Sequence, residues 1–132
     1  MHGELLKARC QGCQHVQTLH SAIGSGSRCG ACNRAGLLRP HIVWFGEMPL
    51  HMERIEAAVA GCGIFIAIGT SATVYPAAGF SRLAASCGAH TVELNLAASD
   101  AAGLFDESHE GPATELVPGY LQRLLRQHAG PA

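Results

Sequence analysis

The sequence lacks an excess of charge of either sign. Nine Lys and Arg residues against ten Asp and Glu residues give a formal net charge of −1 over 132 residues. Proteins that bind nucleic acid through its phosphates carry a basic excess, so this balance argues against that class. The content of 48% hydrophobic and 14% charged residues excludes an intrinsically disordered chain.

Long hydrophobic runs and a secretory signal are missing as well. No apolar run approaches the roughly 20 residues of a membrane-spanning helix, and the longest, Ile64–Ile68, has the length of a strand. The first residues, Met1–Glu4, lack the basic and apolar regions of a signal peptide. We therefore expect a cytoplasmic protein with neither a membrane nor a nucleic acid as partner. At roughly 100–200 residues per domain, the length suffices for one compact domain with its own core.

Four of the six cysteines form two pairs with the spacing C-x2-C-x15-C-x2-C, and they are Cys10, Cys13, Cys29 and Cys32. This spacing is typical of a structural zinc site made of four thiolates. Two intervening residues let both thiolates of a pair face one ion, and we expect Gly12 and Gly30 to supply positive φ angles in these turns. Four protein ligands leave no open position for water, which argues against a catalytic zinc ion.

Two other interpretations of the cysteines are weaker. Disulfides require an oxidising compartment, and nothing in the sequence signals export. A redox C-x-x-C would be a single motif, which would leave the second pair without a purpose. The two remaining cysteines, Cys62 and Cys87, lie in apolar contexts and are predicted to be small buried hydrophobic residues.

After the second cysteine pair, strand and helix patterns alternate. Apolar or β-branched runs predict strands over 41–45, 64–68 and 91–96, and residues 114–117 form a candidate for a short fourth strand. Helices are predicted to begin near prolines, namely Pro49, Pro76 and Pro118, and the first two are predicted to end at Gly61 and Gly88. This alternation predicts an α/β fold with a parallel sheet and flanking helices.

Ligands of open α/β sheets bind beyond the carboxyl ends of the strands. Gly69, Thr70 and Ser71 follow one predicted strand, and Asn95 lies at the end of the next. The first three offer backbone N–H groups and hydroxyls to a phosphate or a ribose, and Asn95 could bind a ribose. The same residues are also common in ordinary turns, so the residues by themselves indicate a nucleotide-binding edge without defining a reaction.

Four ordered segments carry a resemblance to a known family, and they are Met1–Leu6, Leu38–Glu47, Gly69–Ala77 and Val92–Leu96. Around the cysteine pairs, they resemble the carboxyl-terminal half of a bacterial sirtuin, a NAD-dependent protein lysine deacylase. The resemblance implies a partial Rossmann-like NAD-binding domain, formed by residues 1–8 and 37–132. Residues 9–36 would form a zinc-ribbon module inserted into it.

The resemblance implies that His2 is the catalytic base. In the family reaction, the carbonyl oxygen of an acyl-lysine attacks C1′ of the nicotinamide ribose, which releases nicotinamide and forms an alkylimidate. His2 would accept a proton from a ribose hydroxyl, so that the 2′-oxygen can attack the imidate carbon. The products would be the free lysine, nicotinamide and an O-acyl-ADP-ribose. An imidazole suits this proton transfer because it can exchange a proton near neutral pH.

The resemblance also assigns binding residues. The residues expected to contact NAD are Gly69, Thr70, Ser71, Asn95, Leu96, Ala97 and Ala113. The backbone carbonyl of Val43 would hold the acyl-lysine amide. The neighbouring Phe45, Gly46 and Glu47 would pair with the substrate peptide as an added strand. The four paired cysteines would hold one structural Zn²⁺ ion per chain.

A sirtuin begins with a glycine-rich nucleotide loop and an Asn-x-Asp motif, whereas this sequence starts at the catalytic histidine. We therefore expect a truncated chain that holds one half of the NAD cleft, and whether this half is active alone has to be tested. The remaining sheet should have an unpaired apolar edge strand, through which copies of the chain could associate. The alternative function is a non-catalytic zinc-binding module that binds acyl-lysine peptides near Phe45 without consuming NAD. A zinc-ribbon nucleic-acid binder is disfavoured by the net charge.

Overall fold

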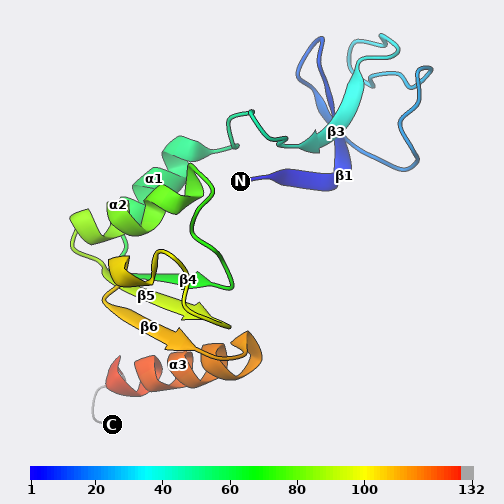
Figure 1. The fold of residues 1–132 in the computed structure, drawn as a ribbon. Coiled ribbons are helices and arrows are strands. Elements are labelled where there is room, and N and C mark those ends of the chain that lie inside the picture. The colour runs from blue at the N-terminus through cyan, green and yellow to red at the C-terminus, as the bar shows by residue number, and fades with distance from the viewer. Residues whose placement is uncertain (129–132) are drawn as a thin grey trace. The chain divides into compact units, whose positions relative to one another are not determined.

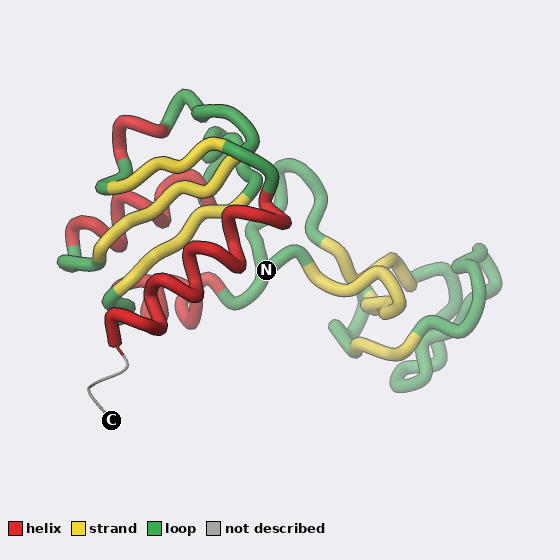
Figure 2. The backbone as a smooth tube through the Cα atoms, turned by 90° about the horizontal axis from the view of Figure 1, so that it is seen from below, coloured by secondary structure: helices red, strands yellow, loops and turns green. Residues whose placement is uncertain are grey.

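The structure is a computed structural model that describes residues 1–128. The chain divides into two compact units, Met1–Met52 and Glu53–Ala132. The first unit contains an antiparallel sheet, and the second contains a parallel sheet between helices (Figures 1 and 2). These units differ from the predicted domains, in which residues 1–8 and 37–52 belong to the larger one.

The first unit is built on three strands: β1 (Gly3–Cys10), β2 (Val16–Thr18) and β3 (Leu38–Ile42). They form an antiparallel sheet in the order β2-β1-β3. The buried apolar residues of this unit are few and small, and they are Ala8, Cys10 and Cys29. A sheet with so little apolar burial needs another source of stability, and the cysteines are placed to supply one through a metal ion.

The predicted strand over 41–45 was wrong in its position. β3 ends at Ile42, and the next residues leave the sheet: Trp44 is 52% exposed and Phe45 is fully exposed. The apolar run therefore does not mark a buried strand. Its second half forms a loop because polar contacts to β3, described below, turn the chain away from the sheet.

The second unit alternates helices and strands: α1 (Met52–Ala60), β4 (Ile64–Ile68), α2 (Phe80–Ser86), β5 (His90–Asn95), β6 (Glu107–Glu110) and α3 (Ala113–His128). Short 3-10 helices cover Ala77–Gly79 and Ala102–Leu104. The strands are parallel in the order β4-β5-β6. The predicted α/β fold with a parallel sheet is confirmed.

The core of the second unit lies between β5 and α3. Val92 and Leu94, both almost fully buried, pack with Tyr120 of α3. Around them lie partly buried apolar side chains, which are Ile66, Leu116, Val117 and Leu124. Figure 1 shows α3 on one side of the sheet and α1 and α2 on the other. Burying each large apolar side chain contributes roughly 1.5–3 kcal/mol, so this cluster is the main source of stability in the unit.

The fourth strand was predicted at the wrong place. Residues 114–117 belong to α3, which continues through Pro118, and the strand is β6 at Glu107–Glu110. Thr114, Val117 and a following proline favour extended backbone in isolation. Packing of Leu116 and Val117 against the core outweighs that preference. β6 carries no hydrophobic periodicity that the sequence analysis could detect.

The predicted end of α2 is found in the structure, whereas the predicted burial of the two unpaired cysteines is not. α2 follows Pro76 through a short 3-10 helix and is followed by Gly88 with φ +87°, so the glycine stop is confirmed. Cys87 is exposed and Cys62 is half-buried, with its Sγ 3.1 Å from the carbonyl oxygen of Val59. The prediction that both are buried was therefore wrong.

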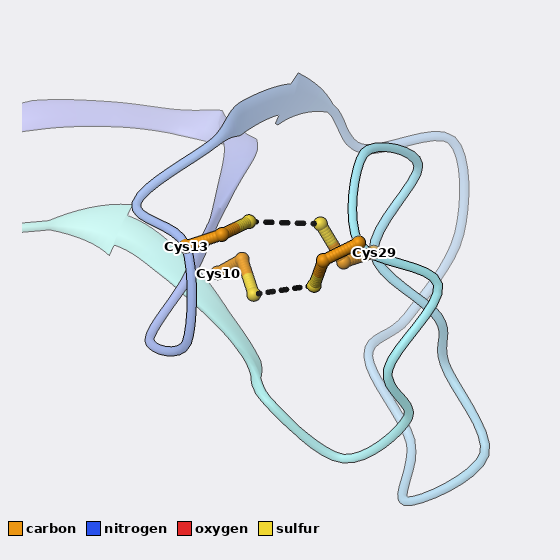
Figure 3. Close-up of side chains that lie close together, drawn as sticks. Cys10, Cys13 and Cys29 are labelled. Carbon is orange, nitrogen blue, oxygen red and sulfur yellow. Dashed lines mark hydrogen bonds between the residues drawn. The ribbon is translucent and has the colours of Figure 1, made fainter.

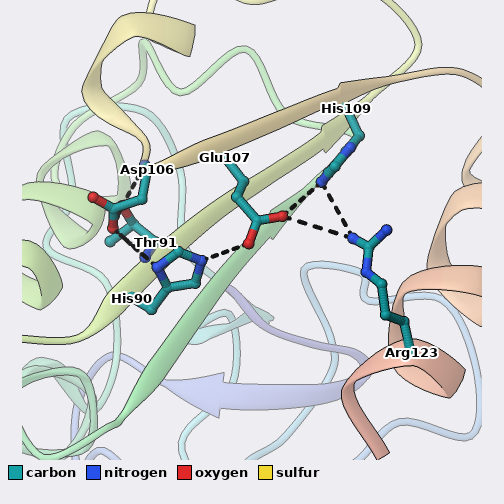
Figure 4. A network of polar contacts seen from close by, with 6 residues as sticks. All are labelled: His90, Thr91, Asp106, Glu107, His109 and Arg123. Atoms are coloured by element: carbon teal, nitrogen blue, oxygen red, sulfur yellow. Dashed lines mark hydrogen bonds and ion pairs between the residues drawn. The ribbon is translucent and has the colours of Figure 1, made fainter. Parts of the chain in front are cut away.

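A polar network crosses the surface between the parallel sheet and α3 (Figure 4). The carboxylate of Glu107 lies 2.7 Å from Nε2 of His90 and 2.8 Å from Nε2 of His109. Arg123 of α3 lies 3.6 Å from the same carboxylate. Hydrogen bonds to the two histidines lower the pKa of Glu107. These contacts link the polar edge strand β6 to α3.

No helix within residues 1–128 is long and apolar enough to cross a membrane.

Candidate functional site

The four paired cysteines converge within the first unit. Their Sγ atoms all lie within 4.8 Å of one another, and Figure 3 shows the sulfur atoms facing each other. Sγ of Cys10 lies 3.7 Å from Sγ of Cys32. Sγ of Cys13 lies 3.6 Å from Sγ of Cys29. A tetrahedral Zn²⁺ ion with Zn–S bonds of about 2.3 Å sets its sulfur ligands about 3.8 Å apart. The cluster therefore fits one Zn²⁺ ion.

The turns between the paired cysteines use other residues than predicted. Positive φ angles occur at Gln14, with 62°, and at Asn33, with 55°, and not at Gly12 or Gly30. A Cβ atom at Gly12 would lie 2.3 Å from Nη2 of Arg34. A side chain at this position would therefore require the guanidinium of Arg34 and the side chain of Leu37 to shift. The expectation of positive φ angles at the two glycines was wrong.

The thiols of the cluster differ in acidity. Hydrogen bonds from the backbone and then the guanidinium of Arg34 lower the pKa of the Cys32 thiol to about 6. A backbone hydrogen bond at His15 lowers the pKa of Cys13, but lost hydration and the facing thiol of Cys29 outweigh it and raise that pKa to about 12. One thiolate is thus present near neutral pH, while another thiol keeps its proton until a metal ion displaces it.

His2 lies at the start of β1, where the chain is tied to the end of β3. The N–H of Val43 donates to the carbonyl oxygen of His2 at 2.9 Å. The next residue, Gly3, has φ +88°, and a Cβ atom there would lie 2.0 Å from the carbonyl oxygen of His41. Any other residue at Gly3 would force β1 and β3 apart. The structure therefore places His2 and Val43 side by side, with the imidazole exposed.

An ion pair that the sequence analysis missed holds residues 43–47. Arg39, which is only 9% exposed, donates from Nη1 and Nη2 to the two carboxylate oxygens of Glu47. Nη2 also donates to the carbonyl oxygen of Ile42 at 3.2 Å. The guanidinium lies 3.9 Å from the ring centre of Trp44, whose N–H donates to Oε2 of Glu47 at 3.0 Å. These contacts fix the loop onto β3.

The ion pair also sets the chemical state of Glu47. Hydrogen bonds from Arg39, and then from the N–H of Trp44, lower the pKa of Glu47 to about 2. Its carboxylate is ionised and already bonded, which indicates a structural role. The tip of the loop, by contrast, presents Phe45 fully exposed beside Gly46 with φ +86°. Arg39 lies in β3 and Glu47 lies in the loop after it, so no helix or strand pattern relates the two and the pair could not be predicted from the sequence.

In the second unit, Gly69, Thr70 and Asn95 meet at the carboxyl ends of β4 and β5. The N–H of Gly69 donates to the carbonyl oxygen of Leu94 at 3.0 Å. Nδ2 of Asn95 donates to the carbonyl oxygen of Thr70 at 2.7 Å. The N–H of Gly111 donates to the carbonyl oxygen of Asn95 at 2.9 Å. The three predicted residues therefore form one hydrogen-bonded group at the sheet edge where α/β proteins bind ligands.

The remaining predicted NAD-binding residues, Ser71, Leu96, Ala97 and Ala113, are exposed around this edge. Ser71 lies two residues after Gly69 and shares a hydrogen bond of 2.8 Å with Thr73. Leu96 and Ala97 directly follow β5, and Leu96 is 76% exposed. Ala113 is the first residue of α3.

A second residue that the sequence analysis missed lies under the same edge. Glu93, in β5, is fully buried. Its carboxylate accepts hydrogen bonds from the hydroxyls of Ser99 and Ser108. Nδ2 of Asn95 lies 3.5 Å from Oε1 of Glu93. The apolar surroundings of Glu93 in the sequence had identified it only as part of a strand.

A sequence model of the Sir2 family matches residues 1–76, which is more than half of the chain. The match includes the cysteine cluster, His2, the 43–47 loop and Gly69. The chain belongs to the Sir2 family. The resemblance found in the sequence is thereby confirmed.

Two curated relatives of this Sir2 chain are both named "NAD-dependent protein deacylase". The protein from Pasteurella multocida is 56% identical over 125 residues, which are 95% of this chain and 53% of that protein. The protein from Escherichia coli K12 is 49% identical over 126 residues, which are 96% of this chain and 45% of that protein. The chain thus spans about half the length of the curated relatives that it matches.

Solved Sir2 structures resemble the chain as well. A mutant Sir2 homologue in complex with ADP-ribose is 30% identical with a TM-score of 0.84, and the match covers 99% of this chain and 53% of that one. A Sir2 homologue in complex with NAD is 30% identical with a TM-score of 0.80, covering 96% and 50%. A Sir2 protein bound to a propionylated peptide is 25% identical with a TM-score of 0.75, covering 93% and 54%. The Sir2 fold of this chain is therefore shown by structure as well as by sequence.

Proposed function

We propose that this Sir2 chain takes part in the NAD-dependent removal of acyl groups from lysine side chains of proteins. The observation that carries the proposal is the hydrogen-bonded group of Gly69, Thr70 and Asn95 at the carboxyl edge of the parallel sheet, in a chain of this family. The printed names of the relatives, and the NAD, ADP-ribose and propionylated peptide in the titles of related structures, support the same chemistry.

In this proposal the edge of the second unit binds NAD. Backbone N–H groups and hydroxyls of Thr70 and Ser71 bind phosphate and ribose oxygens, because positive φ at Gly69 turns the chain out of the sheet. The N–H of Gly69 is bonded to Leu94, so Gly69 shapes this turn and does not donate to the ligand. Asn95 binds the adenosine ribose. The exposed segment of Leu96 and Ala97 and the start of α3 at Ala113 flank the adenine. NAD supplies the electrophilic ribose carbon of the reaction.

The first unit provides the base and the peptide-binding loop in this proposal. His2 accepts a proton from a ribose hydroxyl, and the bonded backbone at Gly3 and Val43 holds it in place. The Val43 carbonyl accepts a hydrogen bond from the acyl-lysine amide, and the backbone at Phe45 and Gly46 pairs with the peptide as an added strand. Glu47 acts through the ion pair with Arg39 and not on the substrate.

The test incubates the zinc-loaded protein with an acetyl-lysine peptide and NAD and follows deacetylated peptide, nicotinamide and O-acetyl-ADP-ribose by mass spectrometry. His2→Ala should abolish all three products and leave the zinc content unchanged. His20→Ala, at another exposed histidine of the same unit, is the matched control and should keep the wild-type rate. Failure of the wild-type chain both to form product and to bind ADP-ribose would contradict the proposal.

A second candidate function is a zinc-binding module that binds acyl-lysine peptides without consuming NAD. It is favoured by the 43–47 loop, which the Arg39–Glu47 pair holds in shape within the first unit alone. Calorimetry with an acyl-lysine peptide distinguishes the two functions. Peptide binding that is independent of NAD, without product, would support the module. Binding that requires NAD would support the deacylase.

We further propose that copies of the chain associate through β4. In the described part of the chain, β4 is the outer strand of its sheet, and its exposed end residue Ile68 is 47% accessible. Ile68→Lys should shift the sedimentation coefficient to that of a monomer, while Leu125→Lys on α3 should not.

The proposal includes a cytoplasmic location, supported by six cysteines in the thiol form, four of them placed as metal ligands. It gives nucleic acids and membranes no role.

A further inference from the structure

Glu93 occupies a place where β5 would more commonly carry an apolar residue. In the sheet register, Glu93 lies between Ala67 of β4 and Ser108 of β6. Both neighbours are small and leave room for a longer side chain. Along β5, Val92 and Leu94 point to the α3 side, so Glu93 and Asn95 share the opposite face. Burying a carboxylate is unfavourable unless its oxygens are hydrogen-bonded, so its partners are informative.

The partners of Glu93 are neutral donors from three different segments. Ser99 lies in the loop after β5, and its hydroxyl donates to Oε1. Ser108 in β6 donates to Oε2 at 2.8 Å. The third is Asn95, whose Nδ2 lies 3.5 Å from Oε1. Within residues 1–128, no Lys, Arg or His forms an ion pair with Glu93. Its oxygens are therefore held by neutral hydrogen-bond donors alone, and one of these donors is the Asn95 amide.

These contacts decide which way the Asn95 amide points. The carbonyl oxygen of Thr70 can only accept, and it lies 2.7 Å from Nδ2. The Glu93 carboxylate, on the same side of the amide, is the second acceptor. Two acceptors require the NH₂ group on that side, so Oδ1 is directed away from both. The side chain of Asn95 thus offers an acceptor to any ligand at the sheet edge.

We propose that Glu93 is a positioning residue that holds the Asn95 amide with Oδ1 toward the ligand and thereby selects a ribose with a free hydroxyl over a phosphorylated ribose. This inference rests on the proposed NAD site. A ribose hydroxyl can donate to Oδ1. A phosphate ester on that ribose replaces this donor with oxygens that accept, and it brings negative charge toward the lone pairs of Oδ1. The site should therefore prefer NAD to NADP.

The first test is calorimetric titration of the zinc-loaded 132-residue protein with NAD and with NADP. The wild type should bind NAD at least about tenfold more tightly than NADP, because the phosphate of NADP leaves Oδ1 without a hydroxyl donor. Glu93→Gln keeps the shape but places an NH₂ group near Asn95, which competes with its orientation. It should weaken NAD binding by about tenfold and reduce the preference over NADP. Unchanged affinity and preference in folded Glu93→Gln would overturn the inference.

Ser108→Ala is the matched control, because it removes a donor from Oε2, the oxygen that does not face Asn95. It should keep the NAD preference. A loss equal to that of Glu93→Gln would show that only the packing of the carboxylate matters, and would overturn the positioning role. If Glu93→Gln does not fold, Glu93→Asp, which withdraws the carboxyl oxygens from Nδ2 of Asn95, takes its place and should reduce the preference.

A ligand-free measurement separates this inference from the proposed function. The side-chain NH₂ resonances of Asn95 in a ¹⁵N-correlated spectrum should shift in Glu93→Gln and stay in place in Ser108→Ala. If the wild type binds neither dinucleotide, the proposed function fails for this chain. The resonances then still decide the positioning role: a shift supports it, and unchanged resonances overturn it.

Discussion

The two units of this Sir2 chain are stabilised by different means. The first, Met1–Met52, buries only small residues and brings four cysteines to one point. The second, from Glu53 onward, packs Val92 and Leu94 of a parallel sheet against α3. The stability of the first unit therefore depends on metal–thiolate bonds and on polar contacts such as the Arg39–Glu47 ion pair, whereas that of the second depends on apolar burial.

This difference separates the proposed functional residues as well. His2 and the 43–47 loop belong to the unit that needs a metal ion, and Gly69 and Asn95 belong to the unit that does not. Loss of zinc should therefore disturb the proposed base and peptide loop while leaving the proposed nucleotide edge folded. The comparison can be tested by changes that affect one unit and spare the other.

The largest effect is expected from Cys29→Ser, which removes a ligand that is only 1% exposed. Structural zinc contributes roughly 10–16 kcal/mol in small zinc modules, so the first unit should unfold and lose stoichiometric zinc. A colorimetric zinc assay and hydrogen exchange resolved by peptide would show exchange rising in residues 1–52 but not in β5. The exposed Cys87 offers the control, since Cys87→Ser should keep the zinc. One zinc per chain in Cys29→Ser would refute the four-thiolate site.

The next largest effect is expected from Leu94→Ala in the other unit. Leu94 is 1% exposed, and removing such a side chain costs about 2–5 kcal/mol through lost burial and a cavity. Chemical denaturation followed with a probe in the second unit should show this loss, with the zinc content unchanged. Leu125→Ala, at a 69% exposed position of α3, should change stability by less than about 0.5 kcal/mol. Zinc loss in Leu94→Ala would show that the two units are not independent.

A smaller, pH-dependent effect is expected from Glu47. Its pKa is lowered from 4.5 to about 2 by Arg39 and the N–H of Trp44. The ionised form is thus favoured in the folded state. The contribution of the Glu47 carboxylate to folding stability is complete above about pH 4.5 and is lost as the pH falls toward about 2. The difference in stability between wild type and Glu47→Gln should therefore shrink over this range. A constant difference would contradict the role of the ion pair.

The smallest effect is expected from His109→Gln, which breaks one side of the surface network around Glu107. Both side chains are about one-third exposed, and such pairs contribute less than about 1 kcal/mol. Thermal unfolding at pH 6 should show a small loss, which should decrease further at high salt because the ion pair is screened. A loss as large as that of Leu94→Ala would mean that the network, and not the apolar core, stabilises the second unit.

Much of the fold could be predicted because periodic apolar patterns directly encode burial. Ile64–Ile68 and the strand ending at Asn95 are found where the sequence indicates them. The cysteine spacing likewise predicts a cluster, since the geometry of a metal site is local to each pair. The polar strand β6 and the first turns of α3 could not be predicted, because only packing against β5 makes those conformations favourable.

The sequence by itself determined the family, the metal-binding pattern and the strand-end residues Gly69 and Asn95, because each depends on residue types at short spacing. Only the tertiary structure decided that Arg39 holds Glu47, and that Glu93 lies under Asn95. The first of these pairs joins residues eight positions apart across a loop, and the second depends on small neighbours in adjacent strands. Such contacts follow from the folded path of the chain, which no local pattern specifies.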